Sequence, residues 1–191
     1  FFRGWDDHVR KVLEKKYLHL FKWFFFKCDR IIVLSSKVKE QLIQWGYKGP
    51  VEIETTLVDK KLLDGITIEQ LKSKYDELAE THRLNLLYLS RVEKRKGIYE
   101  LIDAFERLQK SFADKKELYL KICGDGFELE HVKKLLNSRN ITHVDVPGFI
   151  EGHAKKEVLN WAHVFIFPSY GEGMPNSVLE AMGFGLPVLS T

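Results

Sequence analysis

The chain has 191 residues, of which 45% are hydrophobic and 30% are charged, the profile of a soluble globular protein with room for one domain or for parts of two. Its 30 basic and 27 acidic residues leave a formal net charge of +3, which is too balanced to indicate nucleic acid as a partner. Cys28 and Cys123 have neither metal-ligand spacing nor the clustering of a disulfide framework, so we expect reduced thiols and a cytoplasmic location.

The first predicted element is an aromatic helix over residues 17–27, Tyr-Leu-His-Leu-Phe-Lys-Trp-Phe-Phe-Phe-Lys. It is about half as long as a segment that spans a bilayer. Aromatic helices usually belong to a core, so a packed helix is the favoured interpretation. The alternative is a peripheral contact with the inner membrane face, in which Lys22 and Lys27 lie near lipid headgroups.

Apolar runs typical of buried strands then alternate with amphipathic helical patterns. Strands are predicted over 31–34, 84–89, 118–123, 144–146, 164–167 and 188–189. The clearest helical face is formed by Ile98, Leu101, Ile102, Phe105, Leu108 and Phe112. This alternation predicts βαβ units, and therefore an α/β fold with Rossmann-like parallel sheets that carry helices on both faces.

Residues 55–83 are more polar and include a charged helical pattern over 68–79, so we place a domain boundary near residue 58. Residues 1–58 would be the tail of one α/β domain, and 59–191 most of a second. The chain opens without an initiator Met and ends one residue after an apolar strand. We therefore expect a piece of a longer protein, truncated at both ends.

A basic loop, Ser90-Arg-Val-Glu-Lys-Arg-Lys-Gly97, directly follows the strand over 84–89. Open α/β sheets bind ligands at the carboxyl ends of their strands, so Arg91 and Lys96 stand where a diphosphate could meet them. Arginine offers a planar fork to phosphate oxygens, and lysine a compact charge. Gly97 permits close approach of the backbone. The alternative is a solvated basic loop.

Two weaker patterns follow two further strands. Gly124-Asp-Gly126 comes after the strand that ends at Cys123, and Pro147-Gly-Phe-Ile150 comes at the end of the next one. An ordinary strand-to-helix turn is the favoured interpretation of either pattern alone. Each could also line a flat base through backbone groups near Gly124 and Ile150.

The most informative stretch runs from Phe167 to Glu180. It places Glu172 in a loop between two glycines, begins a helix near Pro175, and puts Glu180 inside that helix. The first turn of a helix presents unpaired N–H groups and a partial positive charge, which suit a phosphate. Two acids beside it could hold hydroxyl groups, so the pattern indicates a sugar joined to a phosphate. The alternative is a capped surface helix. The residues expected to line the ligand are Gly173, Met174, Pro175, Asn176 and Ser177, of which Pro175 has no N–H to donate.

Other site types have little support. The seven histidines are scattered, and none pairs with another at helical spacing. Neither a Gly-x-Ser-x-Gly elbow nor a phosphate-loop signature occurs. We therefore expect no metal site and no cofactor.

In order, Ser-Arg-Val-x3-Lys-Gly, Gly-Asp-Gly, Pro-Gly-Phe-Ile and the run from Phe167 to Val188 resemble the donor-binding half of retaining glycosyltransferases of the group 1 type, family 4. The resemblance is strong over 84–191 and looser over 29–62. It implies the GT-B architecture, in which two Rossmann-like domains face a cleft. It also implies a nucleotide-sugar donor, a glycan or lipid-linked acceptor, transfer with retention of configuration, and no need for a metal.

The resemblance also implies roles for residues. Arg91 and Lys96 would bind the donor diphosphate, and Glu172 would contact hydroxyls of the transferred sugar. Glu180 would hold the ribose, and the backbone around Ile150 would meet the base. The family often has a polar residue on the acceptor side, and Arg3 is the candidate at that position here.

The leading hypothesis is therefore a glycosyltransferase that builds a polysaccharide, a glycolipid or a similar glycoconjugate, with this fragment alone expected to be inactive. One alternative is a non-catalytic subunit that binds a nucleotide sugar and supports a partner transferase. A second alternative, a membrane-surface scaffold, rests only on residues 17–27.

Overall fold

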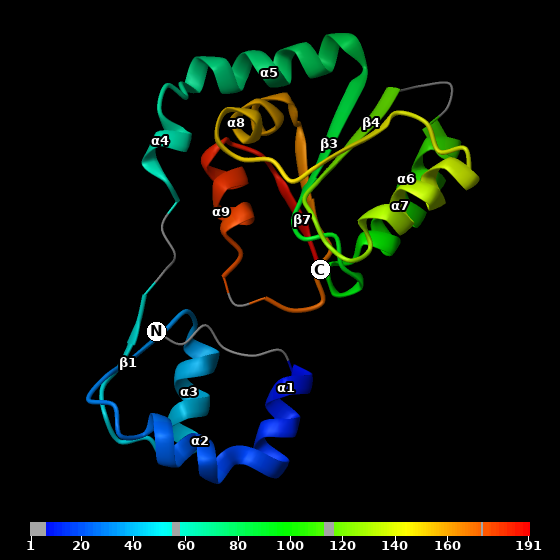
Figure 1. Ribbon diagram of the computed structural model, residues 1–191. Helices are drawn as coiled ribbons and strands as arrows, with labels where there is room; N and C mark the ends of the chain where they lie inside the picture. Colours follow the sequence, from blue (N-terminus) through cyan, green and yellow to red (C-terminus); the bar gives the residue numbers. More distant parts are fainter. Residues whose placement is uncertain (1–6, 55–57, 113–116, 173) are drawn as a thin grey trace. The chain divides into compact units, whose positions relative to one another are not determined.

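The computed structural model describes residues 7–54, 58–112, 117–172 and 174–191. The chain divides into two compact units (Figure 1). The first is assigned residues Phe1–Leu57 together with the segment Gly171–Asn176. The second comprises Val58–Tyr170 and Ser177–Thr191.

The first unit is built on one strand–helix–strand motif. Strands β1 (Ile31–Val33) and β2 (Val51–Ile53) pair in parallel, and α3 (Ser36–Gln44) connects them. The Ser35 side chain accepts a hydrogen bond from the Val38 N–H and so caps α3. Before β1 the chain forms α1 (Asp7–Val12), a π-helical stretch (Leu13–Tyr17) and α2 (Leu18–Phe25).

Helix α2 meets the expectation of a packed aromatic helix on one face only. Phe21 is buried in a cluster with Ile31, Val33 and Leu42. In contrast, Leu20, Trp23 and Phe24 are exposed, so the core interpretation is wrong for them. The Lys27 ammonium lies 4.5 Å from the centroid of the Trp23 ring. Periodicity distinguishes the faces of a helix, but it does not say which face another element covers.

No helix in the described part of the chain combines the length and apolar character needed to cross a membrane.

The second unit contains, within its described residues, a five-stranded parallel sheet in the order β5-β4-β3-β6-β7. The strands are β3 (Arg83–Leu89), β4 (Glu117–Cys123), β5 (Val144–Gly148), β6 (Val164–Phe167) and β7 (Val188–Ser190). Its helices are α4 (Lys60–Leu63), α5 (Ile68–Thr81), α6 (Ile98–Phe112), α7 (Leu129–Ser138), α8 (Gly152–Trp161) and α9 (Asn176–Gly183), with a 3-10 turn at Lys94–Lys96. The predicted α/β fold with a parallel sheet is confirmed.

Helices cover both faces of this sheet. Successive side chains of a strand point to opposite sides, and here both sides carry apolar residues that must be buried. On one face, Tyr88 and Ile122 pack with α6 and α7. On the other, Leu87 and Phe165 pack with α8 and α9. Figure 1 shows the two helix pairs on opposite sides of the sheet. The predicted apolar face of α6 is buried at Ile98, Leu101, Ile102 and Phe105, and the Phe112 side chain lies outside the described set.

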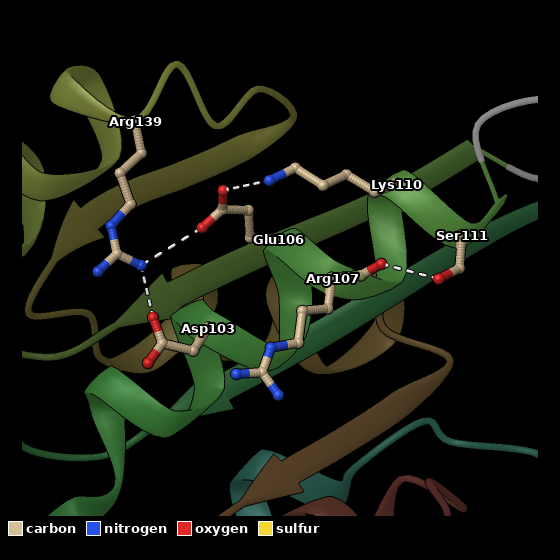
Figure 2. A network of polar contacts seen from close by, with 6 residues as sticks. All are labelled: Asp103, Glu106, Arg107, Lys110, Ser111 and Arg139. Atoms are coloured by element: carbon tan, nitrogen blue, oxygen red, sulfur yellow. Dashed lines mark hydrogen bonds and ion pairs between the residues drawn. The ribbon is translucent and has the colours of Figure 1, made fainter.

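Polar contacts on the outer surface of α6 join it to the end of α7 (Figure 2). Arg139 Nη1 lies 2.5 Å from Asp103 Oδ1 and 3.3 Å from Glu106 Oε2. Lys110 donates to Glu106 at 2.7 Å, and this hydrogen bond is the main cause that lowers the pKa of Glu106. The groups are solvent-accessible, so each ion pair contributes little to the stability of the fold.

The strand order reverses between β3 and β6. From β3 the chain moves outward to β4 and then β5, and β6 returns to pair on the other side of β3. Such a reversal leaves the loops that follow the two central strands on either side of a crevice, which is where open α/β sheets bind ligands. The fold thus directs attention to the loops after β3 and β6.

Candidate active site

The loops after β3, β4 and β5 are joined by backbone hydrogen bonds at the carboxyl edge of the sheet. The Ser90 N–H donates to Cys123 O at 3.1 Å, and the Gly124 N–H donates to Gly148 O at 2.7 Å. Val92 is held from both sides, because its N–H donates to Asp125 O and its carbonyl accepts from the Glu128 N–H. The three predicted loops are therefore neighbours.

Gly124 lies where these loops press together most closely. Its φ is +146°, and a Cβ added there would lie 1.8 Å from the Ser90 carbonyl oxygen. A side chain at this position would push the β3 and β4 loops apart. The glycine is thus required by the approach of two backbones, whatever else the loop binds.

The basic loop after β3 holds Lys96 in a buried position. Residues Lys94–Lys96 form a 3-10 turn that ends at Gly97 with φ +70°. Lys96 is only 7% exposed, and its ammonium lies 5.8 Å from the centroid of the Phe167 ring at the end of β6. A cation fixed in a low-dielectric environment attracts an anion more strongly than one in water.

Arg91 is more accessible and is oriented by an acid of its own loop. Its Nη1 lies 2.8 Å from Glu93 Oε1, and Arg95 Nε lies 2.7 Å from Glu93 Oε2. The hydrogen bond from Arg95 is the largest cause that lowers the pKa of Glu93, so this carboxylate stays ionised. Glu93 thereby orients the Arg91 side chain, which stays 60% exposed and has further guanidinium donors beyond this contact.

The same loop packs directly against the residues that follow β6. The Tyr170 N–H donates to Arg95 O at 3.1 Å, and the Tyr170 hydroxyl donates to Glu100 Oε1 at 2.5 Å. A Cβ added to Gly97 would lie 1.9 Å from the Pro168 carbonyl oxygen. The structure therefore brings the Arg91–Lys96 loop together with the start of the acidic stretch.

Helix α9 begins at Asn176, close to the expected start near Pro175, and includes Ser177 and Glu180. Glu180 is buried, and both of its carboxylate oxygens are contacted by Lys155 of α8, at 3.0 and 3.1 Å. Ile150, just before α8, packs against the apolar cluster that contains residues of both helices. The second unit thus places Glu180 and Ile150 on the elements that follow β5 and β6.

Glu172 belongs to the first of the two compact units. It is exposed and falls with Met174, Pro175 and Asn176 in the first unit, whereas Arg91 and Lys96 belong to the second. That Glu172 shares a pocket with the two cations stays a prediction. Gly173 and Arg3 lie outside the described residues.

Two charged residues of this region were not singled out from the sequence. Glu93 orients Arg91, and Lys155 contacts Glu180. Glu93 could have been noticed, because an acid two residues from each of two arginines favours local pairing. Lys155 gave no signal, because its partner lies 25 residues further along the chain. Among the residues that the structure describes, no group of three or more His, Cys, Asp or Glu is placed to hold a metal ion.

Comparison with known proteins identifies relatives along the chain. The family model for "Glycosyl transferases group 1" matches residues 70–191. The chain is 27% identical over 189 residues to an uncharacterized glycosyltransferase, MJ1059, of Methanocaldococcus jannaschii, covering 97% of this chain and 45% of that protein. It is 30% identical over 197 residues to the putative colanic acid biosynthesis glycosyltransferase WcaL of Escherichia coli K12, covering 100% of this chain and 46% of the relative. The chain thus spans less than half the length of these relatives.

Solved structures show the same fold. The Anabaena protein HepE, in complex with UDP and glucose, superposes with a TM-score of 0.68 at 17% identity, over 91% of this chain and 47% of that one. WaaG, a glycosyltransferase involved in lipopolysaccharide biosynthesis, gives a TM-score of 0.64 at 18% identity, over 96% and 53% of the two chains. Since the family model matches well over half of its residues, the chain belongs to the group 1 glycosyltransferases and has their GT-B type of α/β fold.

Proposed function

We propose that the protein transfers a sugar from a nucleotide-sugar donor to an acceptor hydroxyl, with retention of the anomeric configuration. The observation that carries the proposal is the packing of the Arg91–Lys96 loop against Pro168 and Tyr170, at the reversal point of a parallel sheet. Membership of the group 1 family and the UDP and glucose bound by the similarly folded HepE support it.

In this proposal Arg91 and Lys96 bind the diphosphate of the donor. As the bond between the sugar C1 and the phosphate oxygen breaks, negative charge grows on the departing nucleoside diphosphate. Lys96 and the N–H groups of Met174, Asn176 and Ser177 stabilise this charge without the reorganisation that water would need. Together they supply the electrostatic stabilisation that a metal ion would otherwise give.

Other residues bind the neutral parts of the donor. Glu172 accepts hydrogen bonds from hydroxyls of the transferred sugar, and Glu180 accepts them from the ribose. Backbone groups near Gly124 and Ile150 meet the base. The acceptor oxygen then bonds to C1 on the face that the diphosphate leaves, and its proton passes to a phosphate oxygen of the leaving group. Formation and cleavage on the same face account for retention.

The proposal predicts that the intact protein releases nucleoside diphosphate from a nucleotide sugar when EDTA is present. A panel of nucleotide sugars, assayed with a coupled enzyme that detects the diphosphate, would identify the donor. Glu172→Gln should lower turnover roughly 10- to 100-fold, because a hydrogen bond from the sugar to a charged acceptor is lost. A strict metal requirement, or normal turnover of Glu172→Gln, would contradict the mechanism.

The same assay separates the proposal from its alternative, a non-catalytic nucleotide-sugar-binding subunit. Such a subunit would be stabilised against heat by the donor, but it would release no diphosphate with any acceptor offered. Polysaccharide and lipid-linked glycans are the first acceptors to test, since WcaL is named for colanic acid biosynthesis.

We also propose that α2 makes a peripheral contact with an anionic membrane. Trp23 and Phe24 are exposed, and Lys27 lies over the Trp23 ring, which suits an interface between acyl chains and headgroups. Co-sedimentation of the intact protein with phosphatidylglycerol vesicles should fall in a Trp23→Ser/Phe24→Ser variant. It should persist in Phe127→Ser, which removes from the second unit an aromatic ring that is even more exposed than Trp23 and Phe24. Equal binding of all three proteins would exclude α2 as the contact.

A further inference from the structure

Lys155 and Glu180 form a largely buried ion pair in the second unit. Lys155 Nζ lies 3.0 Å from Glu180 Oε1 and 3.1 Å from Oε2, so one ammonium contacts both oxygens of one carboxylate. The side chains are 26% and 12% exposed, respectively. Removing water from two charges is costly, so a pair like this persists only where its geometry is good.

This geometry leaves the Glu180 carboxylate able to accept further hydrogen bonds. An ionised carboxylate has about four acceptor positions, two on each oxygen. Lys155 occupies one on each, so one acceptor position per oxygen remains. Two adjacent acceptors that receive hydrogen bonds match two neighbouring hydroxyl groups, and the 2′ and 3′ hydroxyls of a ribose are such a pair.

The charge of Lys155 matters as much as its hydrogen bonds. The site is proposed to receive a diphosphate, and an uncompensated carboxylate beside it would repel that ligand. With Lys155 the pair is neutral as a whole, while Glu180 keeps its capacity to accept hydrogen bonds. The next lysine does not share this role, because Lys156 Nζ donates to the backbone carbonyl of Asp64.

We propose that Lys155 is a positioning residue that orients the Glu180 carboxylate toward the ribose hydroxyls and so sets the preference for ribonucleotide over 2′-deoxyribonucleotide donors. The inference rests on the proposed function, since it takes a nucleoside diphosphate as the ligand of this site. Under this inference, Lys155 of α8 joins the residues that determine which donor is bound.

The test is calorimetric titration of the intact protein with UDP, GDP and ADP and with their 2′-deoxy counterparts. For the base that binds, the ribose form should bind roughly tenfold more tightly than the deoxy form, the effect of one hydrogen bond to a charged group. Lys155→Met should reduce that ratio to less than about threefold. Lys155→Arg, which keeps a cation able to meet both oxygens, should restore most of it, and Lys156→Met should leave it unchanged.

A double variant protects the test against misfolding. Lys155→Met alone leaves a buried carboxylate without its cation, whereas Lys155→Met/Glu180→Gln carries no net charge there. If Lys155 acts through Glu180, the double variant should show the same ribose preference as Glu180→Gln alone. A further loss in the double variant would overturn the inference.

The outcomes distinguish the inference from the proposed function. If the wild type prefers the ribose form and Lys155→Met keeps the full ratio, Lys155 does not position Glu180, and the proposed function stands. If the wild type binds none of the three nucleoside diphosphates, the proposed function is wrong and the inference is wrong with it.

Discussion

Replacing Lys96 by methionine should lower turnover by about 10²- to 10³-fold, the usual effect of removing one group that stabilises charge in a transition state. Lys96 is 7% exposed, so its ammonium acts in an environment where charges are poorly screened. Methionine keeps an unbranched stem that can pack near Phe167, so the change removes the charge more than the packing. Steady-state release of nucleoside diphosphate at saturating donor measures the effect.

The matched control is Lys94→Met in the same 3-10 turn. The Lys94 side chain is 77% exposed, and its ammonium lies 3.8 Å from Glu128. An exposed pair of this kind contributes little, so we expect turnover within about twofold of the wild type. Near-normal turnover of Lys96→Met would show that Lys96 does not stabilise the transition state. Equal losses in Lys96→Met and Lys94→Met would indicate a general effect of the charge of the loop.

Gly97→Ala should lower the free energy of unfolding by about 2–5 kcal/mol, through two separate costs. Gly97 has φ +70°, a conformation that costs an L-residue about 1–2 kcal/mol. The added methyl would also lie 1.9 Å from the Pro168 carbonyl oxygen, and relieving such an overlap typically costs about 1–3 kcal/mol. Urea denaturation followed by circular dichroism measures the change.

Gly65→Ala separates the two costs. Gly65 also belongs to the second unit and has φ +79°, but a Cβ added there meets nothing within 4 Å. This variant should lose only the conformational part, about 1–2 kcal/mol. If Gly97→Ala is no more destabilising than Gly65→Ala, the basic loop does not press against Pro168, and the packing that carries the proposed function is absent.

The central strands of the second unit could be predicted because each is a long apolar run. Leu84–Leu89 and Leu118–Cys123 are mostly apolar and mostly buried, as is usual for central strands of a parallel sheet. By contrast, β2 was not predicted. Val51–Ile53 is three residues long, with a glutamate between its two apolar residues, and so short a run lacks a periodicity to detect.

That the loops after β3 and β4 are neighbours could be predicted from chain order. Arg91, Lys96 and Gly124 follow strands, and parallel strands present their carboxyl ends along one edge. The contact between Lys155 and Glu180 could not be predicted, because it depends on how α8 and α9 pack over the sheet. The prediction that α2 is packed in a core was wrong for its exposed side for a similar reason. Sequence pattern alone does not identify which face of a helix a neighbouring element covers.

The central claim is that Arg91, Lys96 and Glu180 serve one nucleotide site. Its most direct test is a crystal structure of the intact protein with the nucleoside diphosphate that binds it. The account predicts phosphate oxygens within about 3 Å of the Arg91 guanidinium and the Lys96 ammonium, with the ribose hydroxyls on Glu180. A nucleotide bound away from the carboxyl ends of β3 and β6, with these three side chains out of contact, would contradict it.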